Sequence, residues 1–181
     1  IREIAVDPIV QKYKNFQISA EKYFPFIHQF QLYECLDTGY QFYYPFSLEG
    51  PAELYEQLEK LPWYYMENKW EHQVTNAYIR PGDLVLEVGC GRGAFIEALT
   101  RQGIQATGLE INPKALSDAQ EKGLNVLPQS VQDHARDYPE KYDIVCMFQV
   151  LEHIADVNGF LKASLQLLKS GGKFVISVPN N

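Results

Sequence analysis

Two carboxylates and a run of alternating glycines are the residues of this chain best suited to hold a cofactor. Glu87 lies near the end of the apolar run 84–88, and glycines occupy every second position of the segment 89–93 that follows. Because glycine has no Cβ, such a loop turns sharply and lets the backbone come close to a ligand. A second carboxylate, Glu110, ends the next apolar run. Together the two features predict a nucleoside-bearing cofactor in the crevice of a parallel sheet.

The elements that must position these residues alternate regularly after residue 83. Apolar runs predict strands at 84–88, 106–109, 124–127, 143–148 and 173–178. Helices are predicted at 94–102, 113–122, 131–137 and 159–168. Asn112 is a suitable cap for the second helix, with Pro113 at its first position. Continuous apolar strands, each followed by a helix, predict an α/β fold with a parallel sheet covered on both faces.

The first eighty residues have weaker periodicity and hold most of the aromatic side chains. Residues 40–46 predict a short strand or an extended loop, and helices are predicted at 51–60 and about 67–79. Pro81-Gly82 predicts a turn that separates the two parts. We therefore expect a mainly helical, aromatic-rich extension or cap over 1–80 and a cofactor-binding domain over 81–181.

Charge and composition exclude several functions. The 181 residues carry a formal net charge of −7, whereas a general nucleic-acid binder has a basic surface. No apolar run has the length of a membrane span and no signal-peptide pattern is present, so we expect a cytoplasmic protein without a membrane partner. The three cysteines are widely spaced, and no spacing of His, Asp or Glu supports a metal site.

The segment 84–179 resembles the class I S-adenosylmethionine-dependent methyltransferases. The resemblance covers a little over half of the chain and implies a Rossmann-like, doubly wound parallel sheet. It implies transfer of a methyl group to a small-molecule or sugar/glycan acceptor by in-line displacement. Because the family sheet has seven strands, we expect a fold without the last two, as in a piece of a longer protein. The motifs are the ExGxGxG loop at 87–93, Gly108-Leu109-Glu110, Tyr142-Asp143-Ile144-Val145, Leu151-Glu152-His153-Ile154 and Leu168-Lys169-Ser170-Gly171-Gly172-Lys173.

The resemblance also implies a site for S-adenosylmethionine, whose product is S-adenosylhomocysteine. In that site Glu87 faces the methionine ammonium, the glycine loop and the following helix face the methionine carboxylate, and Glu110 accepts both ribose hydroxyls. Ile111 packs on adenine, whose edge is hydrogen-bonded within 130–133. The expected cofactor-binding residues are Glu87, Gly89, Cys90, Gly91, Gly93, Glu110, Ile111, Ser130, Val131, Gln132, Phe148 and Gln149.

His153 is the candidate catalytic residue, and it has two interpretations. It is either a general base that takes a proton from an acceptor hydroxyl or a helix-start residue that shapes the pocket. The other histidines, His28, His72 and His134, have no cluster of partners and are expected to be non-catalytic.

Residues just upstream of the first strand have two interpretations as well. Tyr65, Lys69 and Trp70 either cap the methionine end of the cofactor or contact the acceptor, or they belong to an amphipathic helix that covers the sheet. The same helix carries Trp70, Val74, Ala77 and Tyr78 near one face.

Two other functional classes use related features. A nicotinamide-dependent oxidoreductase also combines a glycine loop with a strand-end acid, but Ala94 stands here where its GxGxxG fingerprint has the third glycine. A non-catalytic module that recruits a partner through the aromatic N-terminal part is the second alternative.

Overall fold

The chain forms two compact units, 1–64 and 65–181, and each is described by itself. The computed structural model describes residues 1–48, 50–58, 60–61 and 69–179. The division lies N-terminal to the boundary predicted at 80/81 because helix α3 (Trp70–Asn76) belongs to the second unit. The His72 ring of α3 stacks on Phe95 of that unit, with 4.8 Å between ring centroids.

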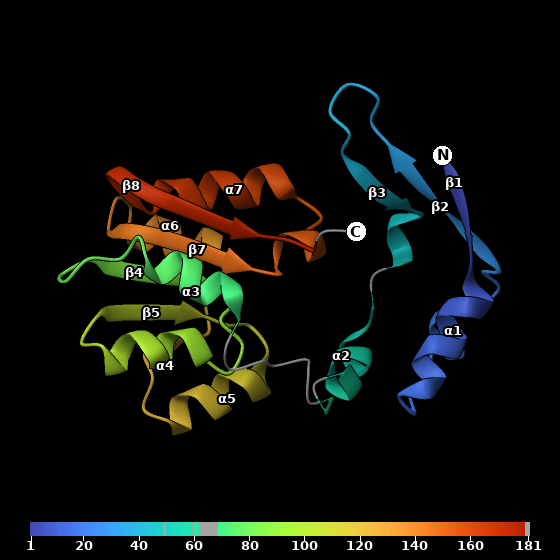
Figure 1. Cartoon of the computed structure of the whole chain (residues 1–181), viewed down its shortest axis with the longest axis horizontal. Helices are drawn as coiled ribbons and strands as arrows, with labels where there is room; N and C mark the ends of the chain where they lie inside the picture. Colours follow the sequence, from blue (N-terminus) through green and yellow to red (C-terminus); the bar gives the residue numbers. More distant parts are fainter. Residues whose placement is uncertain (49, 59, 62–68, 180–181) are drawn as a thin grey trace. The chain divides into compact units, whose positions relative to one another are not determined.

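The second unit is built on a five-stranded sheet in which all neighbouring strands are parallel (Figure 1). Its strands are β4 (Leu84–Val88), β5 (Gln105–Leu109), β6 (Val126–Leu127), β7 (Tyr142–Phe148) and β8 (Leu168–Ser177). The order is β6-β5-β4-β7-β8, so the chain winds outward in both directions from β4 and β7. This confirms the predicted α/β fold, and it creates a topological switch point where ligands commonly bind at the carboxyl ends of strands.

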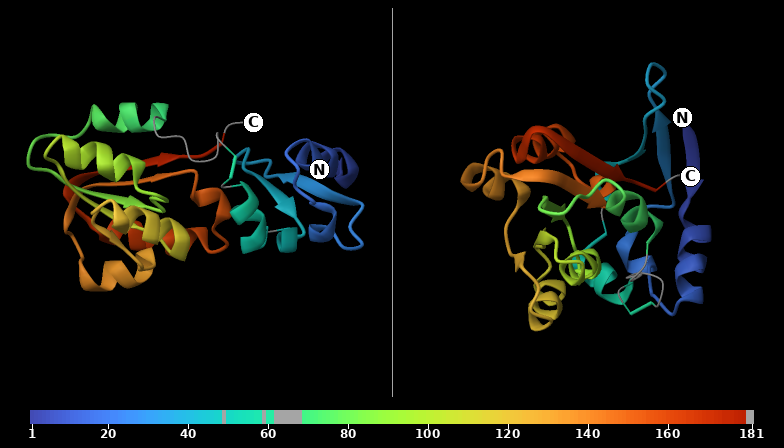
Figure 2. Two further views of the ribbon diagram at one scale, coloured as in Figure 1. Left: turned by 90° about the horizontal axis from the view of Figure 1, so that it is seen from below. Right: turned by 60° about the vertical axis from the view of Figure 1, so that its left-hand side comes forward.

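Helices cover both faces of this sheet (Figure 2). Helices α4 (Ala94–Arg101) and α5 (Pro113–Glu121) bury apolar side chains on the face of Val85. Helices α6 (Val131–Asp137) and α7 (Val157–Gln166) bury theirs on the face of Leu86. Successive strand residues point to opposite faces, so fully apolar strands supply two cores at once.

The last strand begins earlier than predicted. Helix α7 ends at Gln166 and β8 starts at Leu168, whereas the sequence predicted a helix to 168 and a strand from 173. Leu168 pairs with Tyr142, and a register shift between Tyr142 and Ile144 accommodates Gly171 at a φ of 76°. The bulge extends the strand through residues whose glycines alone would predict a turn. A short 3₁₀ turn, η3 (Leu151–His153), follows β7.

The first unit contains a sheet that the sequence predicted only in part. Strands β1 (Arg2–Ala5), β2 (Gln29–Glu34) and β3 (Gln41–Tyr44) pair antiparallel in that order. Helix α2 (Ala52–Leu58) lies within the helix predicted at 51–60, whereas α1 (Val6–Asn15) and the short 3₁₀ turns η1 (Glu21–Tyr23) and η2 (Phe46–Leu48) were not predicted. Tyr33 of β2 stacks on its cross-strand partner Phe42, with 5.5 Å between ring centroids. Such cross-strand aromatic pairs stabilise a sheet whose sequence alternates poorly.

The predicted cap of α5 is confirmed and gives a first testable prediction. The Asn112 Oδ1 atom accepts from the backbone N–H groups of Lys114 at 2.9 Å and Ala115 at 3.1 Å. Asn112→Ala leaves these donors without that acceptor, so we expect the free energy of unfolding to fall by about 1 kcal/mol. Asn112→Asp keeps a cap and should lose less than about half of that. Equal urea midpoints for Asn112→Ala and the wild type would contradict the capping role.

Candidate functional site

A cavity of about 480 Å³ lies at the carboxyl ends of β4 and β7, on the side of the sheet covered by α3, α4 and α5. It combines the glycine loop, charged side chains from β4, α5 and the adjoining loops, and two phenylalanine rings. The lining residues are Lys69, His72, Glu87, Gly89, Cys90, Gly91, Arg92, Ala94, Phe95, Asp118, Glu121, Lys122 and Phe148.

The three glycines of the loop have positive φ angles, but a side chain would be unfavourable at each position for a different reason. An added Cβ would lie 2.6 Å from Val150 Cγ2 at Gly89 and 2.6 Å from Leu124 Cδ1 at Gly93. Those two positions are therefore restricted by packing inside the protein as well as by the backbone. Gly91 has a φ of 54° and lines the cavity, so a side chain there would compete with a ligand.

The amides of the loop are mostly bonded within the protein. Gly89 and Cys90 N–H donate to Leu109 O, Gly93 N–H donates to Cys90 O, and Gly91 N–H donates to a Glu110 carboxylate oxygen. These four N–H groups therefore already have acceptors in this structure. The first turn of α4, which the expectation also included, starts at cavity-lining Ala94, and its N–H groups have no acceptor inside the helix.

Glu87 is a buried carboxylate without a full set of partners. Only 5% of the residue is exposed, and among the described residues no hydrogen-bond partner reaches its Oε2 atom. Burial raises the pKa of Glu87 to about 8; the charge of Lys69 opposes the shift and the charge of Glu110 adds to it. An unpaired buried carboxylate is costly in the free protein. Its place in the cavity wall therefore suits a ligand that brings a cationic N–H donor.

Glu110 is held rigidly beside the glycine loop. One carboxylate oxygen accepts from Gly91 N–H at 2.8 Å, and the other accepts from Asn112 N–H at 2.7 Å. Each ionised oxygen has lone-pair sites for more than one donor, so both retain capacity for a ligand hydroxyl. The structure thus joins the loop and the second carboxylate through one hydrogen bond.

Some of the sequence-predicted residues line the cavity and others do not. Those in its wall are Glu87, Gly89, Cys90, Gly91 and Phe148. Those outside its wall are Gly93, Glu110, Ile111, Ser130, Val131, Gln132, Gln149 and His153.

The residues predicted to bind adenine have structural contacts of their own. Ser130 caps α6, because its Oγ atom accepts from Asp133 N–H at 3.1 Å, and the Val131 side chain is buried in the core. Gln132 is exposed on the same helix. Ile111 is 77% exposed at the end of β5, which leaves an apolar surface beside Glu110.

The residues predicted near the reacting end also differ in setting. Gln149 follows β7 with a φ of 57°, and its side-chain amide donates to Ser177 Oγ at 3.0 Å. The His153 side chain is about half exposed, and its Nε2 atom lies 3.9 Å from a Glu152 carboxylate oxygen. His153 lies in η3, which follows β7, and it is not part of the cavity wall.

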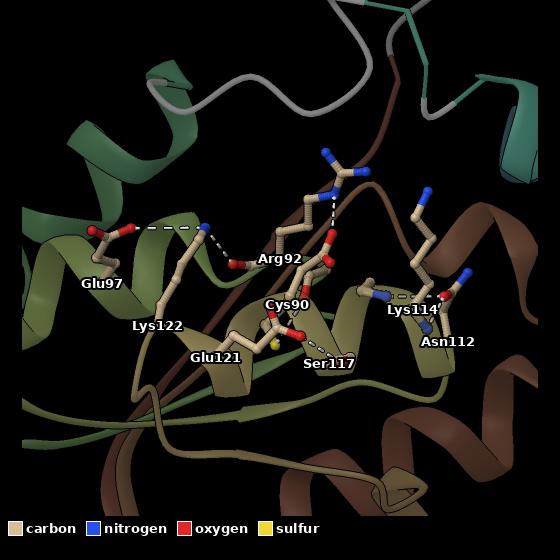
Figure 3. Close-up of polar contacts among 11 residues, drawn as sticks. Cys90, Arg92, Glu97, Asn112, Lys114, Ser117, Glu121 and Lys122 are labelled. Atoms are coloured by element: carbon tan, nitrogen blue, oxygen red, sulfur yellow. Dashed lines mark hydrogen bonds and ion pairs between the residues drawn. The ribbon is translucent and has the colours of Figure 1, made fainter.

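A polar clasp that the sequence did not reveal joins the glycine loop to α5 (Figure 3). Arg92 Nε lies 3.0 Å from Asp118 Oδ2, and Lys122 Nζ donates to the Arg92 carbonyl at 3.1 Å. Lys122 also lies 3.9 Å from Glu97 of α4. Arg92 thereby fixes the loop against a neighbouring helix.

Cys90 fills space in the loop. It is buried, and a Cβ added at Gly108 would lie 2.4 Å from its sulfur. Burial, with the charges of Glu87 and Glu110, raises the pKa of the Cys90 thiol far above its usual range. The thiol therefore stays protonated and is a poor nucleophile.

The segment ahead of β4, which includes α3, contributes two cavity residues. Lys69 and His72 line the wall, while Trp70 is mostly exposed and Tyr65 lies outside the described residues. His72 was expected to be non-catalytic because nothing near it in sequence pairs with it. Its ring neighbours, Phe95 and Phe148, come from distant segments, so only the fold brings them together.

The described part of the chain contains neither a metal-binding cluster nor a helix that could span a membrane. No group of three or more His, Cys, Asp or Glu side chains is arranged to hold a metal ion there. Within the same residues, no helix combines the length and the apolar character needed to cross a bilayer.

Comparison with known proteins gives consistent matches. A family model described as a methyltransferase domain matches residues 63–181. The ubiquinone biosynthesis O-methyltransferase of Serratia proteamaculans is 37% identical over 102 residues, which cover 53% of this chain and 42% of that protein. The protein of the same description from Photorhabdus laumondii is 38% identical over 105 residues, covering 55% and 44%. The chain thus matches less than half the length of these curated relatives.

Solved structures share the fold. A SAM-dependent methyltransferase from Archaeoglobus fulgidus has a TM-score of 0.56 and 27% identity, covering 60% of this chain and 50% of that one. The glycopeptide N-methyltransferase MtfA, crystallised with S-adenosylmethionine, has a TM-score of 0.51 and 20% identity, covering 59% and 52%. At that identity the second match is evidence for the fold alone.

Proposed function

The chain belongs to the methyltransferase domain family, and from that premise we propose that it transfers a methyl group from S-adenosylmethionine to a small-molecule acceptor. The observation that supports this most strongly is the buried Glu87 carboxylate, whose Oε2 atom has no partner among the described residues and which lines the 480 Å³ cavity. A cationic amino group of the cofactor is the complementary partner. A nicotinamide cofactor offers no such ammonium.

The cavity and its surroundings suit each part of that cofactor. Glu87 would bind the ammonium, and the first turn of α4 would bind the carboxylate. Glu110 would accept from the ribose hydroxyls, Ile111 would pack on adenine, and the segment 130–133 would bond the adenine edge. Phe148 and Gln149 would border the methionine tail. When bound, S-adenosylmethionine supplies an activated methyl group on a sulfonium, so no covalent enzyme intermediate is needed.

The protein's own contribution is alignment and exclusion of water. The bonded loop, the clasp from α5 and the phenylalanine rings form a wall that needs little rearrangement. Holding two reactants in line contributes on the order of 7–11 kcal/mol to lowering a barrier. The curated relatives are named as O-methyltransferases, so we propose an acceptor oxygen on a small molecule. A sugar hydroxyl falls within the same chemistry.

The raised pKa of Glu87 leads to a prediction about proton release. With a pKa of about 8 in the free protein, roughly 90% of Glu87 is protonated at pH 7. An ammonium beside it lowers that pKa, so binding should release close to one proton at pH 7. Affinity should accordingly strengthen as pH rises from 6 towards 8, because less free protein has to lose the proton. Calorimetric titration with S-adenosylmethionine in buffers of different ionisation enthalpy measures the release directly.

Glu87→Gln provides the control for this experiment. It cannot ionise, so the released proton should disappear and affinity should fall at pH 8, where wild-type Glu87 pairs with the ligand. Equal proton release in the wild type and in Glu87→Gln would contradict the assignment of Glu87 to the ammonium.

A further inference from the structure

Helix α3 presents polar side chains to the protein and apolar side chains to solvent. Glu71 and Thr75 are buried, and His72 lines the cavity. A helix that only covers a sheet buries its apolar stripe. The exposed side chains of α3 and its C-terminal continuation include Trp70, Val74 and Tyr78. Of the inner face, His72 lines the cavity, whereas the Glu71 carboxylate accepts from Gln149 and Ser177.

His72 is the member of this face that reaches the cavity, and its ring is fixed by aromatic contacts. It stacks on Phe95 with an interplanar angle of 28° and 4.8 Å between ring centroids. It also packs against Phe148, at 5.2 Å between centroids and 55° between planes. Phe95 covers one face of the His72 ring. His72 would therefore contact a polar ligand through its ring edge, where both nitrogens lie.

The same cavity holds the residues assigned to the cofactor. His72 shares its wall with Glu87, Gly91 and Phe148, the last of which ends β7 at the switch point. Among the described histidines, His72 is the one in that wall; His153 lies outside it and is about half exposed. An acceptor has to meet the methyl group within this cavity, so a base in its wall is better placed than one outside.

We propose that His72, rather than His153, faces the point of methyl transfer and takes the proton of the acceptor hydroxyl. This inference rests on the proposed function. The imidazole accepts the O–H proton on a ring nitrogen, the acceptor oxygen forms the new bond to the methyl carbon, and the carbon–sulfur bond breaks. The sulfur keeps that electron pair and leaves as a neutral thioether, so the charges balance. An imidazole suits this role because its ordinary pKa lies near neutral pH.

The test compares the titration of the four histidines in two complexes of the full chain. S-adenosylmethionine carries a positive sulfonium, whereas S-adenosylhomocysteine carries a neutral thioether at the same place. Histidine-labelled protein is titrated by NMR with each ligand, and the His72 signal is assigned by its loss in His72→Gln or through backbone-linked spectra. Lys69 and Glu87 line the same cavity, but their charges are common to both complexes.

We expect the pKa of His72 to be lower by about 1 pH unit with S-adenosylmethionine, because a nearby positive charge disfavours the imidazolium. The remaining histidines serve as internal references for changes that are common to both complexes. Identical titration of His72 in both complexes would overturn the inference, as would a shift at His153 instead. If calorimetry detects binding of neither ligand, the proposed function itself fails, and the inference fails with it.

Discussion

Gly91→Val is expected to weaken S-adenosylmethionine binding by more than about 100-fold, whereas Gly103→Val should leave affinity within about threefold. Gly91 lines the cavity at a φ of 54°, so a branched side chain both strains the loop and enters the ligand space. Gly103 follows α4 at a φ of 77°, and an added Cβ there meets no atom within 4 Å. The two variants therefore share the cost of a branched residue at positive φ, roughly 1–2 kcal/mol, but only one blocks the site.

Calorimetry gives both affinities, and circular dichroism during thermal unfolding checks that both variants fold. If Gly91→Val is folded and binds S-adenosylmethionine like the wild type, the loop does not border the ligand. If both variants lose binding equally, strain in the backbone rather than occupation of the site is the cause, and the cavity assignment is again contradicted.

Glu110→Ala is expected to weaken binding by about 3 kcal/mol, or roughly 100-fold. The substitution removes the acceptor for Gly91 N–H and the two oxygens proposed for the ribose hydroxyls. It therefore disturbs the loop and deletes charge-assisted bonds to the ligand at once. Glu121→Ala is the matched control, because it removes the same charge from a residue of the cavity wall to which no part of the cofactor is assigned.

The two alanine variants are compared with S-adenosylmethionine and with adenosine as ligands. Glu110→Ala should lose affinity for both, since both carry the ribose, while Glu121→Ala should change neither by more than about threefold. If Glu110→Ala lowers the affinity for S-adenosylmethionine but leaves the affinity for adenosine unchanged, Glu110 does not bind the ribose.

The strongest local signals in the sequence predicted the fold well. β4 and α6 have the predicted bounds, and α5 starts at Pro113 behind the Asn112 cap as expected. These elements are defined by short-range features, namely an apolar run, a capping side chain and a proline at the first turn. The start of β8 was not predictable in the same way, because it depends on pairing between Leu168 and Tyr142 across the sheet.

The same difference between local features and long-range contacts explains which residues of the site could be predicted from the sequence. Glu87 and Gly91 were found because a carboxylate and glycines at fixed spacing have a local meaning. His72 and the Arg92–Asp118 ion pair were not found, because their partners lie in segments far apart in sequence. The adenine-binding residues, which resemblance alone suggested, stay predictions.

The most direct test of the central claim is a crystal structure of this chain with S-adenosylhomocysteine. We expect the ligand at the carboxyl ends of β4, β5 and β7, with its ammonium within hydrogen-bond distance of Glu87 Oε2 and its ribose hydroxyls on Glu110. A ligand bound elsewhere, or a Glu87 carboxylate that pairs with a protein group while the ligand is present, would contradict it.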